Sequence, residues 1–320
     1  MRRQPSGVAL ITALLVVAIA TLAATALLSS ASLAIHRTAG LRDGEQAWWV
    51  TRGVEAWVLG ILNTDRKESQ HDSLDEAWSQ PVDYLPVDQG FVRGKVEDLQ
   101  GRFNLNNLNP KNPDIESFRM QFRNLLRNLP DVDEPLGLED AIRDWIDEDQ
   151  NPGSMNGAED TEYLNLNPPY RAANRAFTVV SELLAVRGMT PEVYEKLRPL
   201  VAALPAKASG SFTPTKVNVN TAPLEVLRAL SASPNDQKLT EFERRRHDDP
   251  VKDDKGLQAL IDDGTWGADV KKDKHLAFTS NFFQIQGEVF VGSSRVALYS
   301  LIQRQDGGTS VVLAHSAEPE

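Results

Sequence analysis

A long apolar segment near the N-terminus constrains this chain more than any other feature of its sequence. The segment runs from Val8 to Leu28 without a charged residue, and its only polar side chains are threonine hydroxyls. About twenty residues, at about 1.5 Å per residue, form a helix long enough to cross the roughly 30 Å hydrocarbon core of a bilayer. The residues after about Arg42 are mostly polar. The sequence therefore predicts one membrane-spanning helix followed by a water-soluble remainder.

The apolar segment on its own leaves three interpretations open. A secretory signal peptide would be removed on export, but the apolar run is long for one and residues 23–26 suggest only a loose cleavage motif. A plain signal anchor would keep the N-terminus cytoplasmic through Arg2 and Arg3. The third interpretation depends on Gly7, which ends a short basic leader directly before the run. This arrangement resembles the type IV prepilin class, in which a peptidase cleaves after that glycine and leaves Val8 as the mature N-terminus.

Composition limits the remaining chain to a few classes. At 320 residues, we expect two domains or one domain with a large insertion. The chain has no cysteine, so outside the cytoplasm its fold would be held by packing or by metal, without disulfides. The net charge of -11 argues against nucleic-acid binding, which depends on Lys and Arg neutralising phosphates. The excess of carboxylates is compatible with bound divalent cations.

The helix is predicted to continue well beyond the apolar run. Proline is absent from residues 8–62, and apolar residues in 29–62 recur at helical spacing. We therefore expect one helix of about 50 residues, apolar all round in its first half and amphipathic in its second half. The second half should place one apolar face on a globular domain, and we expect Trp48 and Trp49 to pack against that domain.

Two groups of strand-like segments frame the rest of the chain. Residues 90–99 alternate between apolar and polar, and a Gln-Gly turn leads to a second predicted strand at 102–106. Residues 282–304 alternate around a Gly-Ser-Ser turn, which is typical of a hairpin, and 309–314 fits a last strand. We expect these segments to pair in one antiparallel sheet that covers the apolar face of the helix.

The region between these strands is mainly helical in pattern. Residues 113–128 place Phe118, Phe122 and Leu125 on one face with a 3.6-residue period. The sequence therefore predicts an α+β fold, in which a long N-terminal helix packs on an antiparallel sheet and a large, mainly α-helical domain is inserted between strands. The other predicted helices are residues 138–146, 181–187, 191–204, 223–231 and 257–261.

The clearest candidate site lies in residues 144–170, where carboxylates surround an Asn-Pro-Gly turn. Ca²⁺ takes six to eight oxygen ligands from carboxylates, amides, carbonyls and water, whereas Mg²⁺ keeps more of its water. The spacing differs from that of an EF-hand. A solvated loop with helix-capping side chains is the alternative, but unneutralised carboxylates this close would repel one another. The candidate ligands are Asp147, Asp149, Glu159, Asp160, Glu162 and Asn174.

The sequence shows no catalytic set. Cysteine is absent, the five histidines are scattered without zinc-ligand spacing, and no nucleophile elbow is present. Residues 217–222 resemble the entry to a helix-hairpin-helix element, with Thr221 as N-cap and Pro223 in the first turn. The acidic charge argues against a nucleic-acid role for that element. We therefore predict a protein that is not an enzyme and binds no nucleic acid.

Five motifs along the chain point to one family. They are Gly7 before the apolar helix, the acidic motif at residues 144–149, the Gly-Ala-Glu-Asp motif at 157–160, the Pro-Pro-Tyr motif at 168–175 and the helix-hairpin-helix-like motif at 217–222. Together they resemble the K-type minor pseudopilins of the type II secretion system, the general secretion pathway protein K family. The resemblance covers essentially the whole chain, and the acidic loop with the 168–175 motif is its most specific part.

The resemblance implies a location, a processing step and partners. It implies a single-pass inner-membrane protein with its globular part in the periplasm, cleaved between Gly7 and Val8 by the prepilin peptidase and N-methylated on Val8. It implies a place at the tip of a periplasmic pseudopilus, initiating and capping assembly for export of folded proteins across the outer membrane. The implied partners are I-type and J-type minor pseudopilins, the major pseudopilin and the inner-membrane secretion platform. It also implies Ca²⁺ in the inserted domain, which we map onto the acidic loop.

Thr12 departs from the general pilin pattern. Pilin-class proteins usually carry Glu at the fifth mature position, which is Thr12 when counted from Val8. That carboxylate is thought to pair with the amino terminus of a neighbouring subunit, because a charge in hydrocarbon is costly without a partner. The K type lacks it, so the resemblance implies an assembly position at the end, and the bulky insertion would obstruct stacking above.

The alternative function class is a membrane-anchored periplasmic enzyme or binding protein with an ordinary signal anchor.

These inferences divide the chain into successive parts. The predicted parts are a leader (1–7), a transmembrane half-helix (8–28), the first part of a pilin-like domain (29–109), an inserted helical domain (110–280) and the last strands with the tail (281–320).

Overall fold

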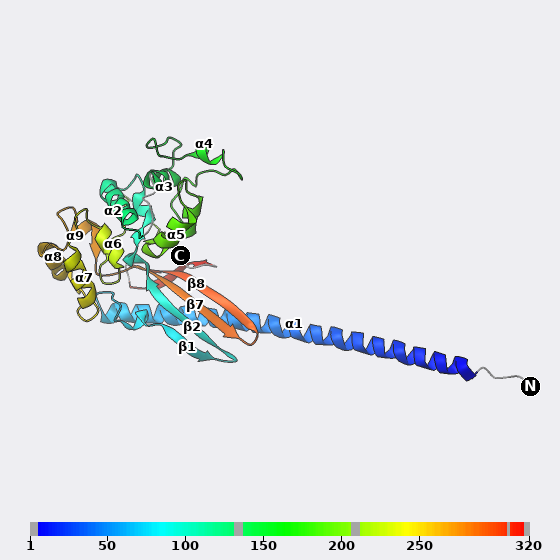
Figure 1. Cartoon of the computed structure of the whole chain (residues 1–320). Coiled ribbons are helices and arrows are strands. Elements are labelled where there is room, and N and C mark those ends of the chain that lie inside the picture. The colour runs from blue at the N-terminus through cyan, green and yellow to red at the C-terminus, as the bar shows by residue number, and fades with distance from the viewer. Residues whose placement is uncertain (1–5, 131–136, 206–211, 306–307, 317–320) are drawn as a thin grey trace, which may run out of the picture.

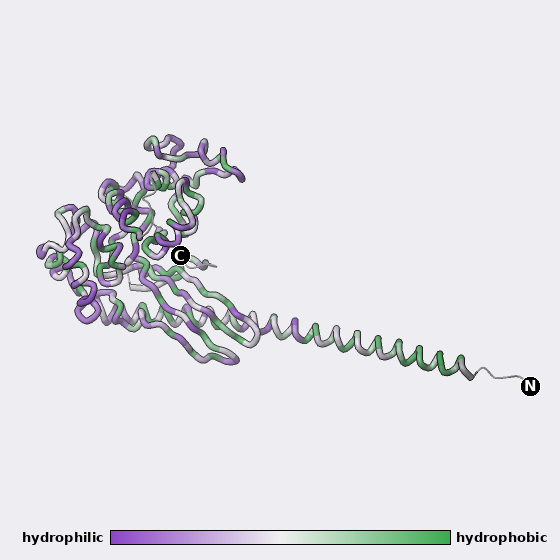
Figure 2. The backbone as a smooth tube through the Cα atoms, in the orientation of Figure 1, coloured by the Kyte–Doolittle hydropathy of each residue, from purple (hydrophilic) through white to green (hydrophobic). Residues whose placement is uncertain are grey.

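One helix sets the shape of the molecule. The computed structural model describes residues 6–130, 137–205, 212–305 and 308–316. Helix α1 (Ser6–Glu68) has 63 residues; its first half projects away from the globular part, and its second half lies along a sheet (Figure 1). Residues 8–38 are exposed throughout, and Figure 2 shows the far end of this projection as hydrophobic. Within the described residues, α1 is the one helix long and apolar enough to cross a membrane.

The polar groups in the apolar half of α1 are satisfied within the helix. The hydroxyl of Thr12 donates to the carbonyls of Val8 and Ala9, at 3.1 and 3.0 Å. Thr21 and Thr25 donate in the same way to carbonyls three or four residues earlier. Because hydrocarbon offers no competing hydrogen bonds, a segment without a free hydroxyl is suited to the bilayer.

A five-stranded antiparallel sheet covers the second half of α1. The strand order is β1-β2-β7-β8-β9, so strands from both ends of the globular sequence are neighbours. The central pair runs without a break from Gly90 opposite Val291 to Asp98 opposite Phe283. Gly292, at φ 53°, forms the predicted hairpin turn between β7 and β8. The strands are β1 (Val82–Val87), β2 (Gly90–Asp98), β7 (Phe282–Val291), β8 (Ser294–Arg304) and β9 (Ser310–Ser316).

Apolar side chains at helical spacing hold α1 on the sheet. Val58 and Leu62 are buried against Phe283 and Ile285 of β7. Towards the membrane side, Ala47 packs in a second cluster with valines of β2 and β7. Burying each large aliphatic or aromatic side chain contributes about 1.5–3 kcal/mol, so this seam fixes the orientation of the helix on the sheet.

The chain between β2 and β7 forms a mainly helical region with its own core. Phe118, Phe122, Leu125 and Ile142 are buried in a cluster that is separate from the helix–sheet seam. The predicted α+β architecture, with helices between strands, is therefore confirmed. The elements of this region are η2 (Leu99–Gly101), β3 (Phe103–Asn104), η3 (Leu105–Leu108), α2 (Ile115–Arg127), α3 (Leu138–Ile146), α4 (Asp160–Tyr163), η4 (Val180–Ala185), α5 (Pro191–Leu197), η5 (Arg198–Leu200), β4 (Val201–Ala202), β5 (Val217–Asn218), α6 (Leu224–Ala229), α7 (Asp236–Arg245), α8 (Asp254–Asp262), α9 (Lys272–His275) and β6 (Leu276–Ala277).

Some local predictions are wrong. The strand predicted at 102–106 does not join the antiparallel sheet, because β3 pairs in parallel with β4 in a separate two-stranded ladder. The helix predicted at 191–204 ends as α5 at Leu197, where a 3-10 turn and a short strand follow. Helix α7 was not predicted, because its sequence is dominated by charged side chains that obscure the buried Leu239 and Phe242.

The prediction that Trp48 and Trp49 pack against the globular domain is also wrong. Trp48 is 47% exposed and Trp49 is 69% exposed. At about 100° per residue, Trp49 lies almost opposite the sheet-facing Val58 and Thr51. The two indoles contact each other edge to face, with ring centroids 4.8 Å apart. Large apolar surface is therefore left in the open on α1, about twenty residues or roughly 30 Å beyond the end of the apolar run.

Candidate metal centre

Carboxylates gather where α3 ends and α4 begins. Asp144 lies in the last turn of α3, Asp147 is its C-cap, and Glu159 is the N-cap of α4. One oxygen from each of the three lies within 4.8 Å of the others. Two helix ends and the loop between them thus place acidic groups from distant positions in one spot.

Glu159 is the carboxylate of this cluster with the fewest partners. The residue is 1% exposed, and neither carboxylate oxygen has a hydrogen-bond partner among the described residues. The same holds for Oδ1 of Asp147. An ionised carboxylate buried without a partner costs several kcal/mol, so roughly that much must be offset by a proton or a cation. Burial first, and then the charges of Asp147 and Asp144, raise the pKa of Glu159 to about 7.

Asp147 shares this electrostatic environment. Burial raises its pKa to about 6, and the neighbouring charges of Asp149 and Asp144 add to the effect. The raised values have one physical meaning: near neutral pH, the site holds more negative charge than its surroundings stabilise. A divalent cation among the carboxylates would reverse this situation, because it favours the ionised form of each ligand.

Asp144 is held in place by the loop that follows it. The residue is fully buried, and both of its oxygens accept the N–H of Gly153 at 3.2 Å. The guanidinium of Arg143 lies 3.3 Å from Oδ1. Gly157 also approaches closely: a Cβ at this position would lie 2.0 Å from Oδ2 of Asp144. Only glycine allows this approach, so the loop is shaped around the carboxylate.

Asn174 brings a neutral oxygen to the same region. Its backbone N–H donates to the carbonyl of Trp145, the neighbour of Asp144, at 3.0 Å. Its φ of 50° is a left-handed conformation, which asparagine tolerates better than most residues. Its Oδ1 atom is buried and has no partner within the described part of the chain. An amide oxygen of this kind is a ligand that Ca²⁺ accepts.

The other predicted ligands lie outside this cluster. Asp149 is exposed and accepts the N–H of Asn151. Asp160 pairs with Arg171 at 3.0 Å. Glu162 is exposed, and its nearest cation, 3.8 Å away, belongs to Arg187.

The sequence-based set therefore missed one residue and included three that the structure places elsewhere. Asp144 was missed, although its position three residues before Asp147 places both on one side of the helix end. Asp147, Glu159 and Asn174 from the predicted set carry the buried oxygens without partners. Which of these carboxylates are buried depends on how α3 and α4 meet, and the local sequence pattern does not encode that contact.

Aromatic side chains fix the base of this loop. The ring of Tyr163 lies edge to face with Trp145 at 5.2 Å and is stacked on Tyr170 at 5.4 Å. The hydroxyl of Tyr163 accepts the N–H of Arg187, and that of Tyr170 donates to the carbonyl of Ala185. These three aromatic rings connect α3, α4 and the segment that follows α4, and they support the loop that carries the carboxylates.

The N-terminal positions lie on α1, far from the carboxylates. Gly7 and Val8 are in its first turns, and Thr12 presents an exposed side chain whose hydroxyl is bonded to its own helix. Cleavage after Gly7 and methylation of Val8 stay predictions at this point.

Comparison with known proteins agrees with the fold. A family model for type II secretion system (T2SS), protein K, matches residues 101–206. The type II secretion system protein K of Pseudomonas aeruginosa is 38% identical, over 98% of this chain and 93% of the relative. That of Aeromonas hydrophila is 33% identical, over 97% and 96%. A chain in the crystal structure of the GspK-GspI-GspJ complex from enterotoxigenic Escherichia coli matches with a TM-score of 0.69 and 26% identity, covering 88% of this chain and 98% of that chain. This chain therefore belongs to the type II secretion system protein K family and is a minor pseudopilin of type II secretion.

Proposed function

We propose that this chain is the tip subunit of the type II pseudopilus. Helix α1 anchors it in the inner membrane, and the sheet and helical region stand in the periplasm. I-type and J-type minor pseudopilins bind it there. Major pseudopilins are then added beneath this tip complex, between it and the inner-membrane secretion platform. Growth from below then pushes folded proteins towards the outer membrane. The protein acts by assembly and not by catalysis.

The uncovered face of α1 is the observation that carries this proposal. Opposite the sheet-facing residues, Trp49 is followed by Gly53, Ala56 and Gly60, all on the outward side at about 100° per residue. A Cβ at Gly53 or Gly60 would meet nothing within 4 Å. A large exposed aromatic beside small residues fits the approach of another helix, with the indole as anchor. The similar chain in the GspK-GspI-GspJ crystal structure is in a complex with two other proteins, which supports two partner helices for this chain.

Thr12 supports an end position in the assembly. Its side chain is a neutral hydroxyl that donates to the carbonyls of Val8 and Ala9, so Thr12 offers no negative charge to the amino terminus of a subunit above. The free amino group of a mature Val8 can still receive the carboxylate of a subunit below. The helical region beyond the sheet adds bulk at the other end (Figure 1).

The partner surface gives a direct test of the proposal. Replacing Trp49 with Ala, or Gly53 with Trp, is expected to weaken capture of detergent-solubilised I-type and J-type partners by about tenfold or more, because an anchor is lost or the approach is blocked. The full chain would be co-purified with both partners and the bound ratio measured. The control is Tyr84→Ala, which removes a 65% exposed aromatic from β1. Equal capture by all four proteins would contradict this surface.

We also propose that Ca²⁺ occupies the carboxylate cluster. The ligands that fit are Asp144, Asp147, Glu159 and the side-chain oxygen of Asn174, completed by backbone carbonyls or water. The buried oxygens without partners on three of these residues support the assignment. The ion would tie the end of α3 to the start of α4, and its role is structural.

Gly157 tests the geometry of this site. A Gly157→Ala variant is expected to bind Ca²⁺ at least about tenfold more weakly, because the new methyl group displaces the buried Asp144 carboxylate. Isothermal titration of the metal-free full chain measures this. The control is Gly53→Ala on the open face of α1, where an added methyl group meets no atom. Unchanged affinity in Gly157→Ala would place the ion elsewhere.

A further inference from the structure

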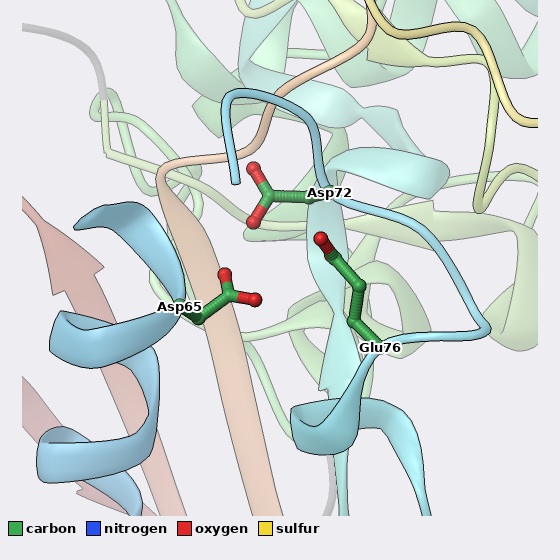
Figure 3. Close-up of side chains that lie close together, drawn as sticks. All are labelled: Asp65, Asp72 and Glu76. Carbon is green, nitrogen blue, oxygen red and sulfur yellow. The ribbon is translucent and has the colours of Figure 1, made fainter. Parts of the chain in front are cut away.

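A second group of carboxylates lies where the helical region joins the sheet. Asp65 comes from the last turns of α1, Asp72 from the loop that follows, and Glu76 from the residue before η1 (Ala77–Ser79). Figure 3 shows the three side chains directed towards a common centre. One oxygen from each lies within 4.8 Å of the others.

A buried arginine enters this group from the end of β8. Arg304 is 2% exposed, and its guanidinium lies 2.7 Å from Asp72 and 3.1 Å from Asp65. The same guanidinium stands over the ring of Phe283, 4.8 Å from its centroid. The centre is therefore unlike the α3–α4 cluster, because a protein cation already occupies part of it and makes a metal ion there unfavourable.

Hydrogen bonds connect this group to both chain segments that link the sheet to the helical region, the one that follows β2 and the one that precedes β7. The N–H of Asp72 donates to the carbonyl of Phe278 at 2.9 Å, and Oδ2 of Asp72 accepts the N–H of Ser280 at 2.7 Å. The hydroxyl of Ser280 donates in turn to Asp98 at the end of β2. Asn218 of β5 donates to Asp98 and to the backbone carbonyl of Asp72, both at 3.0 Å.

Thr221 belongs to the same network and does not cap α6. Its hydroxyl donates to Asp98 at 2.6 Å, and the N-cap of α6 is Pro223, so the prediction that Thr221 caps this helix is wrong. The network thus ties α1, β2, β8 and the helical region together through two buried aspartates, Asp72 and Asp98. We call Asp65, Asp72, Glu76, Asp98 and Arg304 the junction cluster.

The junction cluster contains more carboxylates than its cation can neutralise. Arg304 pairs directly with Asp72 and Asp65, and Glu76 and Asp98 add two further carboxylates to the group. Two titratable neighbours lie beside Glu76: Nε2 of His71 is 4.0 Å from it, and Asp75 accepts the hydroxyl of Ser73. Glu76 is otherwise held by the N–H of Ser73 and the indole of Trp78. Ionised carboxylates this close and this buried repel one another strongly, so at least one of them holds a proton under mild conditions.

We propose that the junction cluster is a proton-linked joint, which binds the helical region firmly to the sheet when it is protonated and loosens when it is fully ionised. The joint would make the rigidity of the tip subunit respond to the acidity of the compartment around it. This device is independent of the proposed calcium site and of partner binding.

The sign of the effect follows from the direction of the shifts. Burial first, and then the charges of Glu76 and Asp72, raise the pKa of Asp65 to about 7. Burial also raises the pKa of Asp98 to about 6. The folded protein therefore binds protons that the unfolded chain has released, and stability from these protons falls as pH rises through about 6 to 7. The joint is tight in mild acid and weaker in mild alkali.

Melting curves of the full chain in detergent, with saturating Ca²⁺, test this joint. The wild-type Tm is expected to fall by about 3–6 °C from about pH 6 to about pH 8.5. Asp65→Asn resembles the protonated form, so its Tm at the higher pH should exceed that of the wild type, and its pH dependence should be smaller. Glu76→Gln keeps an acceptor for Ser73 and should act in the same direction. The control is Asp83→Asn on β1, an exposed carboxylate outside the cluster.

Hydrogen exchange locates the effect. After correction for the intrinsic exchange rate, protection of the N–H groups of Asp72 and Ser280 should fall at the higher pH in the wild type and stay high in Asp65→Asn. The proposal is overturned if Asp65→Asn and Glu76→Gln keep the full pH dependence of the wild type, or if Asp83→Asn flattens it equally. It is also overturned if protection at the junction does not change with pH.

Discussion

Chelation of Ca²⁺ with EGTA at about pH 8 is expected to lower the Tm of the detergent-solubilised full chain by about 10 °C. The reason is that removing the ion leaves the carboxylates of Asp144, Asp147 and Glu159 close together without a cation, and oxygens of Asp147 and Glu159 are buried without hydrogen bonds. An ion bound at about a thousand times its Kd contributes roughly 4 kcal/mol, which sets the size of the shift. Native mass spectrometry should find the metal in the untreated protein and none after chelation.

Acidity should reduce this effect in a defined direction. Because the pKa values of Asp147 and Glu159 are raised to about 6 and about 7 without metal, protons neutralise the empty site at about pH 5.5 and compete with Ca²⁺. The metal-free protein is thus penalised least in mild acid, and its stability falls as pH rises through those values. The drop in Tm on chelation is therefore expected to be smaller at about pH 5.5 than at about pH 8.

Two matched variants separate the structural assignment from the sequence-based one. Glu159→Gln should remove the response to EGTA, because it replaces a buried carboxylate at the centre of the cluster. Glu162→Gln should leave the response unchanged, because Glu162 is exposed and close only to Arg187. A response lost in Glu162→Gln and kept in Glu159→Gln would move the site to the other side of α4. An unchanged wild-type Tm with no metal detected would eliminate the site.

The overall architecture could be predicted because it rests on long, repetitive patterns. The unbroken apolar run and the absence of proline indicate α1, and alternation in 90–99 and 282–304 indicates the central strands. Predicted helices with a strong apolar face, such as 113–128 and 138–146, correspond to α2 and α3. The short elements were mistaken where tertiary contacts decide the outcome: β3 pairs with β4, almost a hundred residues away, and no local pattern reports that partner.

The candidate site was predicted as a region but not residue by residue. Clustering of acidic residues around 144–162 indicated the loop, since charge density is visible in sequence. Which carboxylates are buried depends on how α3 and α4 meet, and Asp160, adjacent to Glu159, turns to Arg171. The junction cluster was not foreseen, because Arg304 lies more than two hundred residues after Asp65 and Asp72 and meets them only once the sheet is closed.

The N-terminal helix gives the prediction with the largest effect on function. Replacing Gly7 with Val is expected to abolish cleavage before Val8, because the peptidase of the prepilin class requires the small residue that ends the leader. The variant should keep the leader, gain no N-methyl group and fail to assemble, so secretion should be lost. Intact mass and N-terminal sequencing of membrane-purified protein measure this directly, and the wild type should begin with methylated Val8.

A control in the same helix keeps this test specific. Gly40→Val changes a glycine of α1 at which a Cβ would meet no atom within 4 Å, so processing should be unaffected. A Gly7→Val protein that still matures at Val8 would contradict the prepilin assignment. A wild-type N-terminus near residue 27 would instead indicate an ordinary signal peptide, and the apolar half of α1 would then be absent from the mature protein. Since Thr12 is part of the mature protein only if the apolar half is retained, the position of this one cleavage decides whether that half of α1 is an assembly helix or a targeting signal.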